Sequence, residues 1–240
     1  MTQDDPLIKE FLDHIIVEKG LSRNTRLSYS SDLSRYAQCL KKNNVEPINA
    51  SSGDITAFLK YLRDAGISPR SCTRSLVAVR GFYKFLLKGK KIKESPCANV
   101  DMPRFDMKLP EFLSLEEVDR LLSAPDSSSV RGLRNKAMLE TLYAAGLRVS
   151  ELVSLKLNGI SLQKGFLTAF GKGSKERLVP LGESAMIWLK RYIDDARPAL
   201  CAKKNSSPFL FLTSRGSRMS RQNFWTLIKK TALAAGIDTS

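Results

Sequence analysis

The sequence has very little of what a metal site or a disulfide framework requires. It contains a single histidine, His14, and four cysteines that lie far apart and form no CxxC pair. Cysteines and histidines at short spacings are typical of zinc sites, and dense cysteines are typical of small disulfide-bonded domains. We therefore expect reduced thiols, a cytoplasmic protein, and neither a metal nor another cofactor. The cysteines are Cys39, Cys72, Cys97 and Cys201.

Long apolar segments and nucleotide-binding motifs are also missing. No run of about 18 apolar residues occurs, so we expect no membrane-spanning segment. The first ten residues, MTQDDPLIKE, are acidic and lack the apolar core of a signal peptide. The P-loop pattern, GxxxxGK followed by Ser or Thr, is absent, which argues against an ordinary phosphate-handling enzyme.

Basic residues, by contrast, are abundant. The 240 residues include 39 lysines and arginines against 24 acidic residues, for a net charge of +15 and a pI near 9.8. Binding of such a chain to a polyanion releases counterions, so nucleic acid is the first candidate partner. The alternative is a basic protein without an anionic partner. The length fits two small domains.

The first half of the chain predicts four helices. Apolar residues recur at helical spacing within residues 7–16, 33–40, 55–62 and 76–87. Serines before these segments are expected N-caps: Ser22, then Ser51 or Ser52, then Ser68, which Pro69 follows at the first helical position.

The fourth of these helices carries charge of one sign. Residues 66–93 contain eight basic residues and no acidic one. At about 100° per residue, five of them fall within an arc of roughly 120°, opposite an apolar side that includes Leu87. A solvated surface usually mixes charges, so this basic face is predicted to follow DNA phosphates. Its residues are Arg70, Arg74, Arg80, Lys84 and Lys88.

A proline-rich segment at residues 94–112 predicts a linker between two domains. We expect a four-helix bundle over residues 1–105 and a mainly helical domain with a small antiparallel sheet over residues 106–240. The first carries 18 basic and 11 acidic residues (+7), and the second carries 21 and 13 (+8). Both halves are therefore predicted to contact one polyanion, with the linker letting them close around it.

The second half predicts both helices and strands. Ser114 and Glu117 have capping-box spacing, Gly146 is an expected helix end, and Ser220 is an expected cap. Two strands are expected at residues 159–170 and 175–181, joined around the Gly-Lys-Gly-Ser turn at 171–174, with a short third at 208–213. The expected helices are 115–123, 131–145, 149–157, 183–196 and 220–235.

Two basic residues stand out as candidates for chemistry. Arg148 lies in YAAGLRVSE, among apolar residues at the junction of two predicted helices, and we expect it to be buried. Glu151, three residues later, is expected to hold the Arg148 guanidinium in place so that it can bind a ligand. The alternative is that Arg148 and Glu151 form an internal ion pair without a ligand. Lys172 lies at the tip of the predicted hairpin, where the alternative is an ordinary solvated lysine.

Together these motifs resemble the tyrosine recombinase (phage integrase) family, in its Xer branch. AAGLRVSEL and, about two dozen residues later, GKGSKERLVPL carry the resemblance. LSRNTRLSYSSDLSRY and SPRSCTRSLVAVRGFYKFLL resemble the family's N-terminal DNA-clamping domain. LPEFLSLEEVDRLL and FLTSRGSRMSRQNFWTLIKKTALAAGI resemble its catalytic domain.

The resemblance implies an enzyme that cleaves DNA at a specific site through a 3′-phosphotyrosyl bond and rejoins it without a cofactor. Arg148 would then stabilise charge on the phosphate, Lys172 would protonate the leaving 5′ oxygen, and Glu151 would support the site. The implied role is chromosome dimer resolution before cell division, by a tetramer on two DNA sites, with a paralogous recombinase as a further expected partner. Besides the basic face, the implied DNA-binding residues are Arg23, Asn24, Thr25, Lys175, Arg177, Arg215, Arg221 and Gln222.

The sequence departs from the family pattern at its end. The family continues with a histidine–x–x–arginine box, a further histidine or tryptophan and the tyrosine nucleophile, whereas this chain ends at GIDTS. None of its six tyrosines follows the required motif. We expect a truncated recombinase that binds DNA but does not cleave it; the alternative is a natural short DNA-binding protein derived from a recombinase. A helical DNA-binding protein without catalytic ancestry and an RNA-binding protein fit the paired motifs less well.

Overall fold

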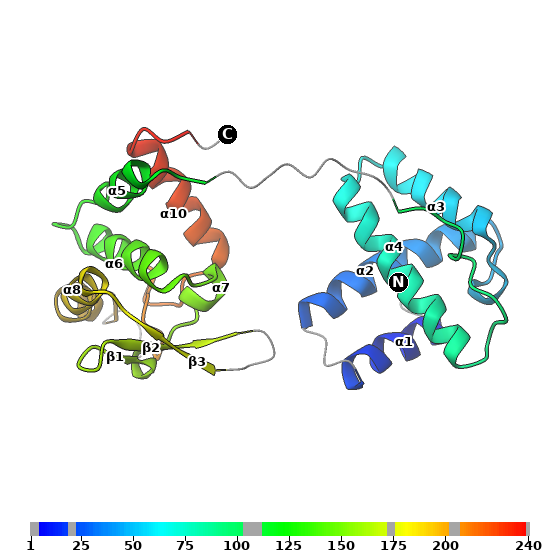
Figure 1. The fold of residues 1–240 in the computed structure, drawn as a ribbon, viewed down its shortest axis with the longest axis horizontal. Coiled ribbons are helices and arrows are strands. Elements are labelled where there is room, and N and C mark those ends of the chain that lie inside the picture. Colours follow the sequence, from blue (N-terminus) through cyan, green and yellow to red (C-terminus); the bar gives the residue numbers. More distant parts are fainter. Residues whose placement is uncertain (1–4, 19–22, 103–111, 172–175, 202–206, 239–240) are drawn as a thin grey trace. The chain divides into compact units, whose positions relative to one another are not determined.

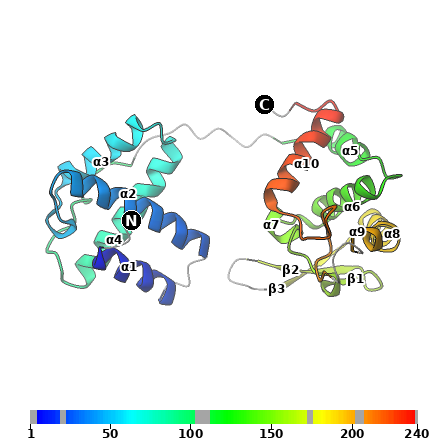
Figure 2. The same ribbon diagram turned by 180° about the vertical axis from the view of Figure 1, so that it is seen from behind.

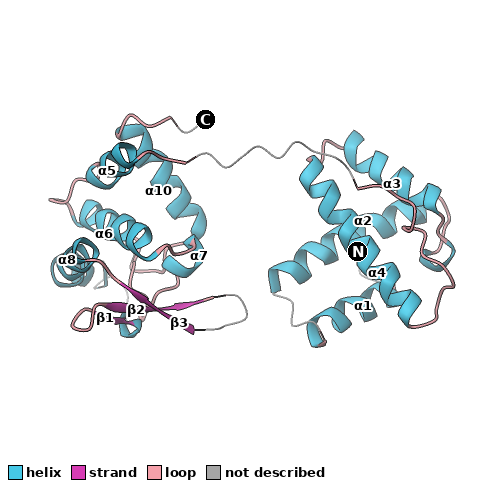
Figure 3. Ribbon diagram, in the orientation of Figure 1, coloured by secondary structure: helices cyan, strands magenta, loops and turns pink. Residues whose placement is uncertain are grey.

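The computed structural model describes residues 5–18, 23–102, 112–171, 176–201 and 207–238 (Figure 1). The chain divides into two compact units, Met1–Leu109 and Pro110–Ser240. The first is helical, and the second combines helices with a three-stranded antiparallel sheet (Figure 3). The predicted fold class is thereby confirmed. Among the described helices, none has both the length and the apolar composition that a membrane span requires.

Four helices build the first unit, and serines begin two of them as predicted. The Ser51 side chain accepts a hydrogen bond from the Asp54 backbone N–H, and Ser68 accepts one from Ser71. The predicted cap at Ser22 lies outside the described residues. The helices are α1 (Pro6–Val17), α2 (Arg23–Lys42), α3 (Ser52–Asp64) and α4 (Pro69–Lys88), with a 3₁₀ turn at Pro47–Asn49.

An aromatic cluster forms the centre of this unit. Tyr36, Phe58, Phe82 and Tyr83 are fully buried, and their rings meet edge to face. The Tyr36 and Tyr83 hydroxyls lie 2.6 Å apart, so the polar tips satisfy each other inside the core. Leu87, which the sequence places on the apolar side of α4, is 41% exposed.

The second unit begins with capped helices as the sequence predicts. Ser114 and Glu117 form a capping box, Ser129 caps the next helix, and Gly146 ends that helix in the left-handed conformation, at φ 54°. Ser220 caps the last helix. The helices are α5 (Leu115–Ser123), α6 (Val130–Ala145), α7 (Val149–Leu152), α8 (Glu183–Arg191), α9 (Arg197–Cys201) and α10 (Arg221–Ala234).

Three predictions for this unit are wrong in detail. The helix expected over 149–157 ends at Leu152, and a 3₁₀ turn follows at Leu157–Gly159. The helix expected over 183–196 is interrupted by a π-helical turn at Tyr192–Ala196. The segment 208–213 forms only isolated bridges, because it pairs with loop residues instead of joining the sheet.

The sheet has the order β1 (Ile160–Ser161), β2 (Phe166–Phe170) and β3 (Glu176–Pro180), and every pair is antiparallel. Two strands were predicted here; the first, expected over residues 159–170, is divided in the structure into β1 and β2. The sheet lies along one side of the helices, and α8 and α10 lie on opposite sides of α6 (Figures 1 and 2).

The register of β3 places a charged residue on the inner face of the sheet. Ala169 and Leu167 of β2 are fully buried, and their cross-strand partners are Arg177 and Val179. Opposite partners share a face, so Arg177 lies on the inner face of the sheet with 39% of its side chain exposed, whereas the apolar Leu178 lies on the outer face and is 66% exposed. This is the reverse of the usual pattern, in which apolar residues turn inward.

Candidate active site

The junction between α6 and α7 positions Arg148. Gly146 ends α6, Leu147 is buried as an anchor, and Arg148 occupies the N-cap of α7 with extended backbone, at φ −69° and ψ 148°. Its carbonyl accepts the first hydrogen bonds of α7 from Glu151 and Leu152. The backbone turn therefore sets the direction in which the Arg148 side chain leaves the protein.

The prediction that Arg148 is buried is wrong. Its side chain is 72% exposed, because the neighbouring Leu147 and Leu152 turn into the core while the guanidinium turns toward solvent. The predicted contact with Glu151 is confirmed: Arg148 Nη1 donates to Glu151 Oε1 over 3.1 Å, and the Arg148 backbone N–H donates to Oε2 over 2.9 Å. The guanidinium is thus accessible to a ligand and held at one edge.

Glu151 is the buried member of the group. Only 4% of its side chain is exposed, and a second arginine reaches it from the sheet. Arg177 donates from Nη1 to Oε1 over 3.0 Å and from Nη2 to Oε2 over 2.8 Å. Hydrogen bonds from Arg177, then from Arg148, lower the pKa of the Glu151 carboxyl to about 2, although burial acts to raise it. Glu151 therefore stays charged between two arginines.

Another arginine, Arg218, ties α7 to the loop before α10. It donates from Nε to the Val153 carbonyl over 3.1 Å and from Nη2 to the Ser154 hydroxyl over 2.8 Å. It thereby satisfies the C-terminal end of this short helix. In this loop the sequence analysis singled out Arg215, as a DNA-binding residue, and not Arg218. Arg218 lies too far from Val153 and Ser154 in the sequence for a local pattern to reveal these contacts.

A small pocket adjoins Glu151. It has a volume of about 230 Å³ and is formed by Ser150, Glu151, Ser154, Leu155 and Phe170. Lys172 and Lys175 both lie outside the described residues, in the connection between β2 and β3. Their assignments as general acid and DNA contact remain predictions.

The residues of the basic face of α4 differ in how firmly they are held. Arg70, Lys84 and Lys88 are exposed. Arg74 is 45% exposed but donates from Nε and Nη2 to Asp32, over 2.8 and 3.1 Å, and Arg80 donates to the Val100 carbonyl. The first three therefore have the greatest freedom to contact an anion.

Asp32 is a buried carboxylate that the sequence analysis missed. It is fully buried on α2 and also accepts a hydrogen bond from the Ser75 hydroxyl over 2.9 Å. The available signal was its place one residue before Leu33 and four before Tyr36, on the apolar side of that helix. Asp32 fixes α2 against α4 and orients Arg74.

The other predicted DNA-binding residues lie at helix starts and in one loop. Arg23, Asn24 and Thr25 form the first turn of α2, and Asn24 is exposed. Arg215, Arg221 and Gln222 are exposed at and before the start of α10. Among the described hydrogen bonds, none joins Arg215, Arg221 or Gln222 to the cluster of Arg148, Glu151 and Arg177.

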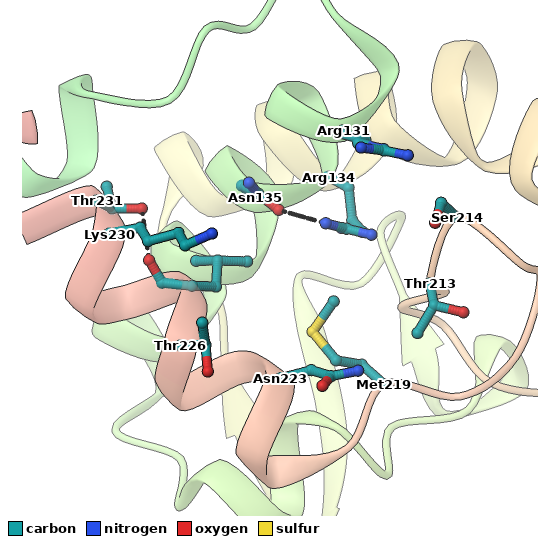
Figure 4. Close-up of a pocket in the computed structure, with 11 residues that line it drawn as sticks. Arg131, Arg134, Asn135, Thr213, Ser214, Met219, Asn223, Thr226, Lys230 and Thr231 are labelled. Carbon is teal, nitrogen blue, oxygen red and sulfur yellow. Dashed lines mark hydrogen bonds between the residues drawn. The ribbon is translucent and has the colours of Figure 1, made fainter.

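A second, larger cleft lies between α6, α10 and the loop 213–219 (Figure 4). It has a volume of about 370 Å³, and its lining includes Arg131, Arg134 and Lys230 but no acidic residue. Arg134 is only 8% exposed; it donates to Asn135 Oδ1 and, over 2.9 Å, to the Leu212 carbonyl, and burial lowers its pKa. The sequence analysis predicted none of these residues, because their proximity depends on tertiary packing.

The tyrosines offer little for nucleophilic chemistry. Tyr36, Tyr83 and Tyr192 are fully buried, and burial raises the pKa of each, in the case of Tyr192 to about 12. Tyr61 belongs to the first unit, and Tyr143 is 56% exposed in the last turn of α6. Within the described ranges, no three His, Cys, Asp or Glu residues come together as a metal site.

Comparison with protein families gives two matches that together cover most of the chain. Residues 111–240 match the phage integrase family, and residues 8–90 match the phage integrase N-terminal SAM-like domain. A tyrosine recombinase XerD of Pseudomonas putida is 48% identical over 98% of this chain and 78% of the relative. A tyrosine recombinase XerD of Listeria innocua is 41% identical over 97% of this chain and 79% of the relative.

Solved structures share the fold at low sequence identity. A lambda integrase dimer bound to a COC′ core site superposes with a TM-score of 0.72, at 16% identity, over 98% of this chain and 79% of that one. The XerH recombinase bound to its difH substrate before cleavage also gives 0.72, at 17% identity, over 97% and 70% of the two chains.

Proposed function

Because the chain belongs to the phage integrase family, as a tyrosine recombinase of the Xer branch, we propose that it acts in resolving chromosome dimers before cell division. Enzymes of this kind are site-specific recombinases that cleave and rejoin DNA strands. Similarity to XerD proteins over nearly the whole chain supports this cellular role, and we propose that the protein acts in the cytoplasm, where the chromosome lies.

The proposed chemistry centres on one phosphate of the DNA backbone. A tyrosine oxygen attacks the phosphorus, the bond to the 5′ oxygen breaks, and a 3′-phosphotyrosyl bond holds the strand until a 5′ hydroxyl attacks it in turn. Negative charge grows on the non-bridging oxygens during both steps. Arg148 stabilises that charge with its two-pronged guanidinium, and Lys172 donates the proton that the leaving 5′ oxygen takes up.

The observation that carries this proposal is the combination of exposure and restraint at Arg148. The guanidinium is 72% exposed, yet a carboxylate that is 4% exposed holds it. A purely internal ion pair has no need of an exposed guanidinium at a helix N-cap. A donor that is fixed before the substrate arrives needs little reorganisation as charge develops, and this is what gives oxyanion-type stabilisation its strength.

We further propose that these 240 residues bind duplex DNA without cleaving it. The three buried tyrosines cannot reach a phosphate, and no described contact joins an exposed tyrosine to Arg148. The test incubates the chain with nicked duplex DNA that carries a recombination site and traps any covalent product. The comparison protein is an extended chimera, in which these residues are joined to the part of the Pseudomonas putida relative that the chain does not match.

The expected result is a DNA complex with both proteins and a covalent adduct with the extended chimera alone. An adduct with the 240-residue chain would mean that one of its own tyrosines is the nucleophile. No adduct with either protein, together with normal DNA binding, would favour a DNA-binding protein that has lost recombinase chemistry.

Assembly on DNA is part of the proposal. A related lambda integrase has been solved as a tetramer bound to a Holliday junction, and we propose a tetramer on two DNA sites here, with a paralogous recombinase as partner. Sedimentation of the extended chimera with one and then two DNA sites tests the assembly. Complexes that never exceed one protein per site would contradict it.

A further inference from the structure

Arg177 lies on the inner face of β3, a position better suited to holding another residue of the site than to contacting DNA. Its partner across the sheet is the fully buried Ala169, so its side chain leaves β3 on the inner face. The neighbouring Leu178 takes the outer face and is 66% exposed. A strand that turns its arginine inward and its leucine outward goes against the usual pattern, and such exceptions concentrate at functional sites.

The contact that Arg177 makes there is specific in geometry. Two of its nitrogens meet the two Glu151 oxygens one to one, over 3.0 and 2.8 Å. This side-by-side arrangement fixes the plane of the carboxylate as well as its position. A lysine cannot reproduce it, because an ammonium group is a single point of charge.

Glu151 transmits that restraint to Arg148. The same two oxygens accept the Arg148 Nη1 and backbone N–H, over 3.1 and 2.9 Å. Glu151 is the one described residue to which the Arg148 side chain is hydrogen-bonded, and most of that side chain is in solvent. The direction of the Arg148 guanidinium therefore depends on where Glu151 is held, and Arg177 holds it.

We propose that Arg177 is a positioning residue of the recombination site, which orients the Arg148 guanidinium toward the DNA phosphate by clamping Glu151 between β3 and α7. The inference rests on the proposed role of Arg148 at the phosphate. It replaces the prediction of a direct DNA contact at Arg177 with an indirect role through one carboxylate.

The test uses the 240-residue chain without DNA and follows two nuclear magnetic resonance signals. The first is the Glu151 carboxyl carbon, titrated with pH. The second is the Arg148 Nη1–H signal, whose exchange with water reports how firmly Glu151 holds the guanidinium. In Arg177→Ala we expect the Glu151 pKa to rise by about one unit or more, as loss of a close opposite charge requires. The Arg148 Nη1–H should exchange severalfold faster.

Two further variants separate positioning from general stability. Arg177→Lys keeps the charge and should give an intermediate pKa and intermediate exchange. Arg218→Ala is the matched control, because it also removes an arginine bound to α7 but touches Val153 and Ser154 instead of Glu151. It should leave both signals in place. The amide spectrum checks the fold, and if Arg177→Ala unfolds, Arg177→Lys alone decides.

Unchanged Glu151 and Arg148 signals in a folded Arg177 variant would overturn the proposal. A second arm asks about DNA directly, in a Glu151→Gln background where the clamp is already broken. There Arg177→Ala should leave the salt dependence of DNA binding unchanged. A fall of about 0.9 in the logarithmic slope would make Arg177 a phosphate contact and refute the positioning role. Since the signals are read without DNA or cleavage, failure of the proposed recombinase function would be seen separately.

Discussion

At the scale of single residues, Glu151 links stability to pH. Its pKa of about 2 in the folded chain lies below its ordinary value of 4.5, so its ion pairs stabilise the fold above pH 4.5 and that contribution is lost as the pH falls toward 2. Glu151→Gln should lower the free energy of unfolding at pH 7 by about 3 kcal/mol, the order of a broken buried ion pair. Urea denaturation at pH 7 and pH 3 measures this.

The dependence on pH and a second variant of the same hairpin serve as controls for the Glu151→Gln measurement. The difference between wild type and Glu151→Gln should shrink at pH 3, because the carboxyl, with its ordinary pKa of 4.5, is then mostly protonated in the unfolded chain and folding must ionise it. Glu176→Gln, an exposed change on the same hairpin, should stay within about 0.5 kcal/mol at both pH values. A Glu151→Gln effect of equal size at both pH values would show that its ion pairs are not the source of the stability.

A second residue-scale prediction separates Lys172 from Arg148 in the extended chimera. A general acid matters only where the leaving oxygen needs a proton, and a bridging 5′-phosphorothioate leaves as a stable thiolate. Lys172→Ala should therefore cleave normal DNA slowly and the sulfur-substituted DNA at close to the wild-type rate, whereas Arg148→Ala should be slow on both. Rescue of both variants, or of neither, in a single-turnover assay would contradict the separate roles.

At the scale of elements, α4 combines exposed basic residues, which we predict to face DNA, with an arginine that is bound to the buried Asp32. Lys84 is exposed, so Lys84→Ala should reduce the logarithmic salt slope of DNA binding by about 0.9, the effect of one lost phosphate contact. Arg74→Ala should instead lower the free energy of unfolding by about 1 to 3 kcal/mol, because it removes the closer charged partner of the buried Asp32 and leaves only Arg35, at 3.7 Å, among the described ion pairs of that carboxylate. A salt series and urea denaturation measure the two effects.

The pair is informative because the two residues share one helix. An unchanged slope for Lys84→Ala would remove this part of α4 from the DNA-binding surface. If Arg74→Ala instead lowered the logarithmic salt slope of DNA binding by about 0.9 and left the free energy of unfolding unchanged, Arg74 would be a phosphate contact whose bond to Asp32 opens when DNA is bound.

The helices also show which parts of the fold can be predicted from neighbouring residues in the sequence. Ser51, Ser68, Ser114 and Ser220 all begin helices as predicted, since a cap and its partner lie within four residues. The end of α7 was not predictable in this way. It is satisfied by Arg218, 65 residues beyond Val153 in the chain, and only the tertiary fold brings the two together.

At the scale of the whole molecule, the sequence indicated the family and the Arg148–Glu151 contact but not the exposure of Arg148 or the role of Arg177. A run of apolar neighbours suggested burial, yet a single turn at Gly146 sends those neighbours and the guanidinium in different directions. The bond between Arg177 and Glu151 depends on strand register, which the sequence specifies only through the completed sheet.

The most direct test of the account is the rate at which Arg148→Ala forms the covalent DNA adduct in the extended chimera. Cleavage should slow by about 100-fold or more, the effect of removing one preorganised donor from a developing oxyanion. Lys190→Ala, an exposed change on α8, is the matched control and should keep the wild-type rate. With the fold checked by its amide spectrum, an Arg148→Ala rate equal to that of the control would contradict the placement of the reacting phosphate at Arg148.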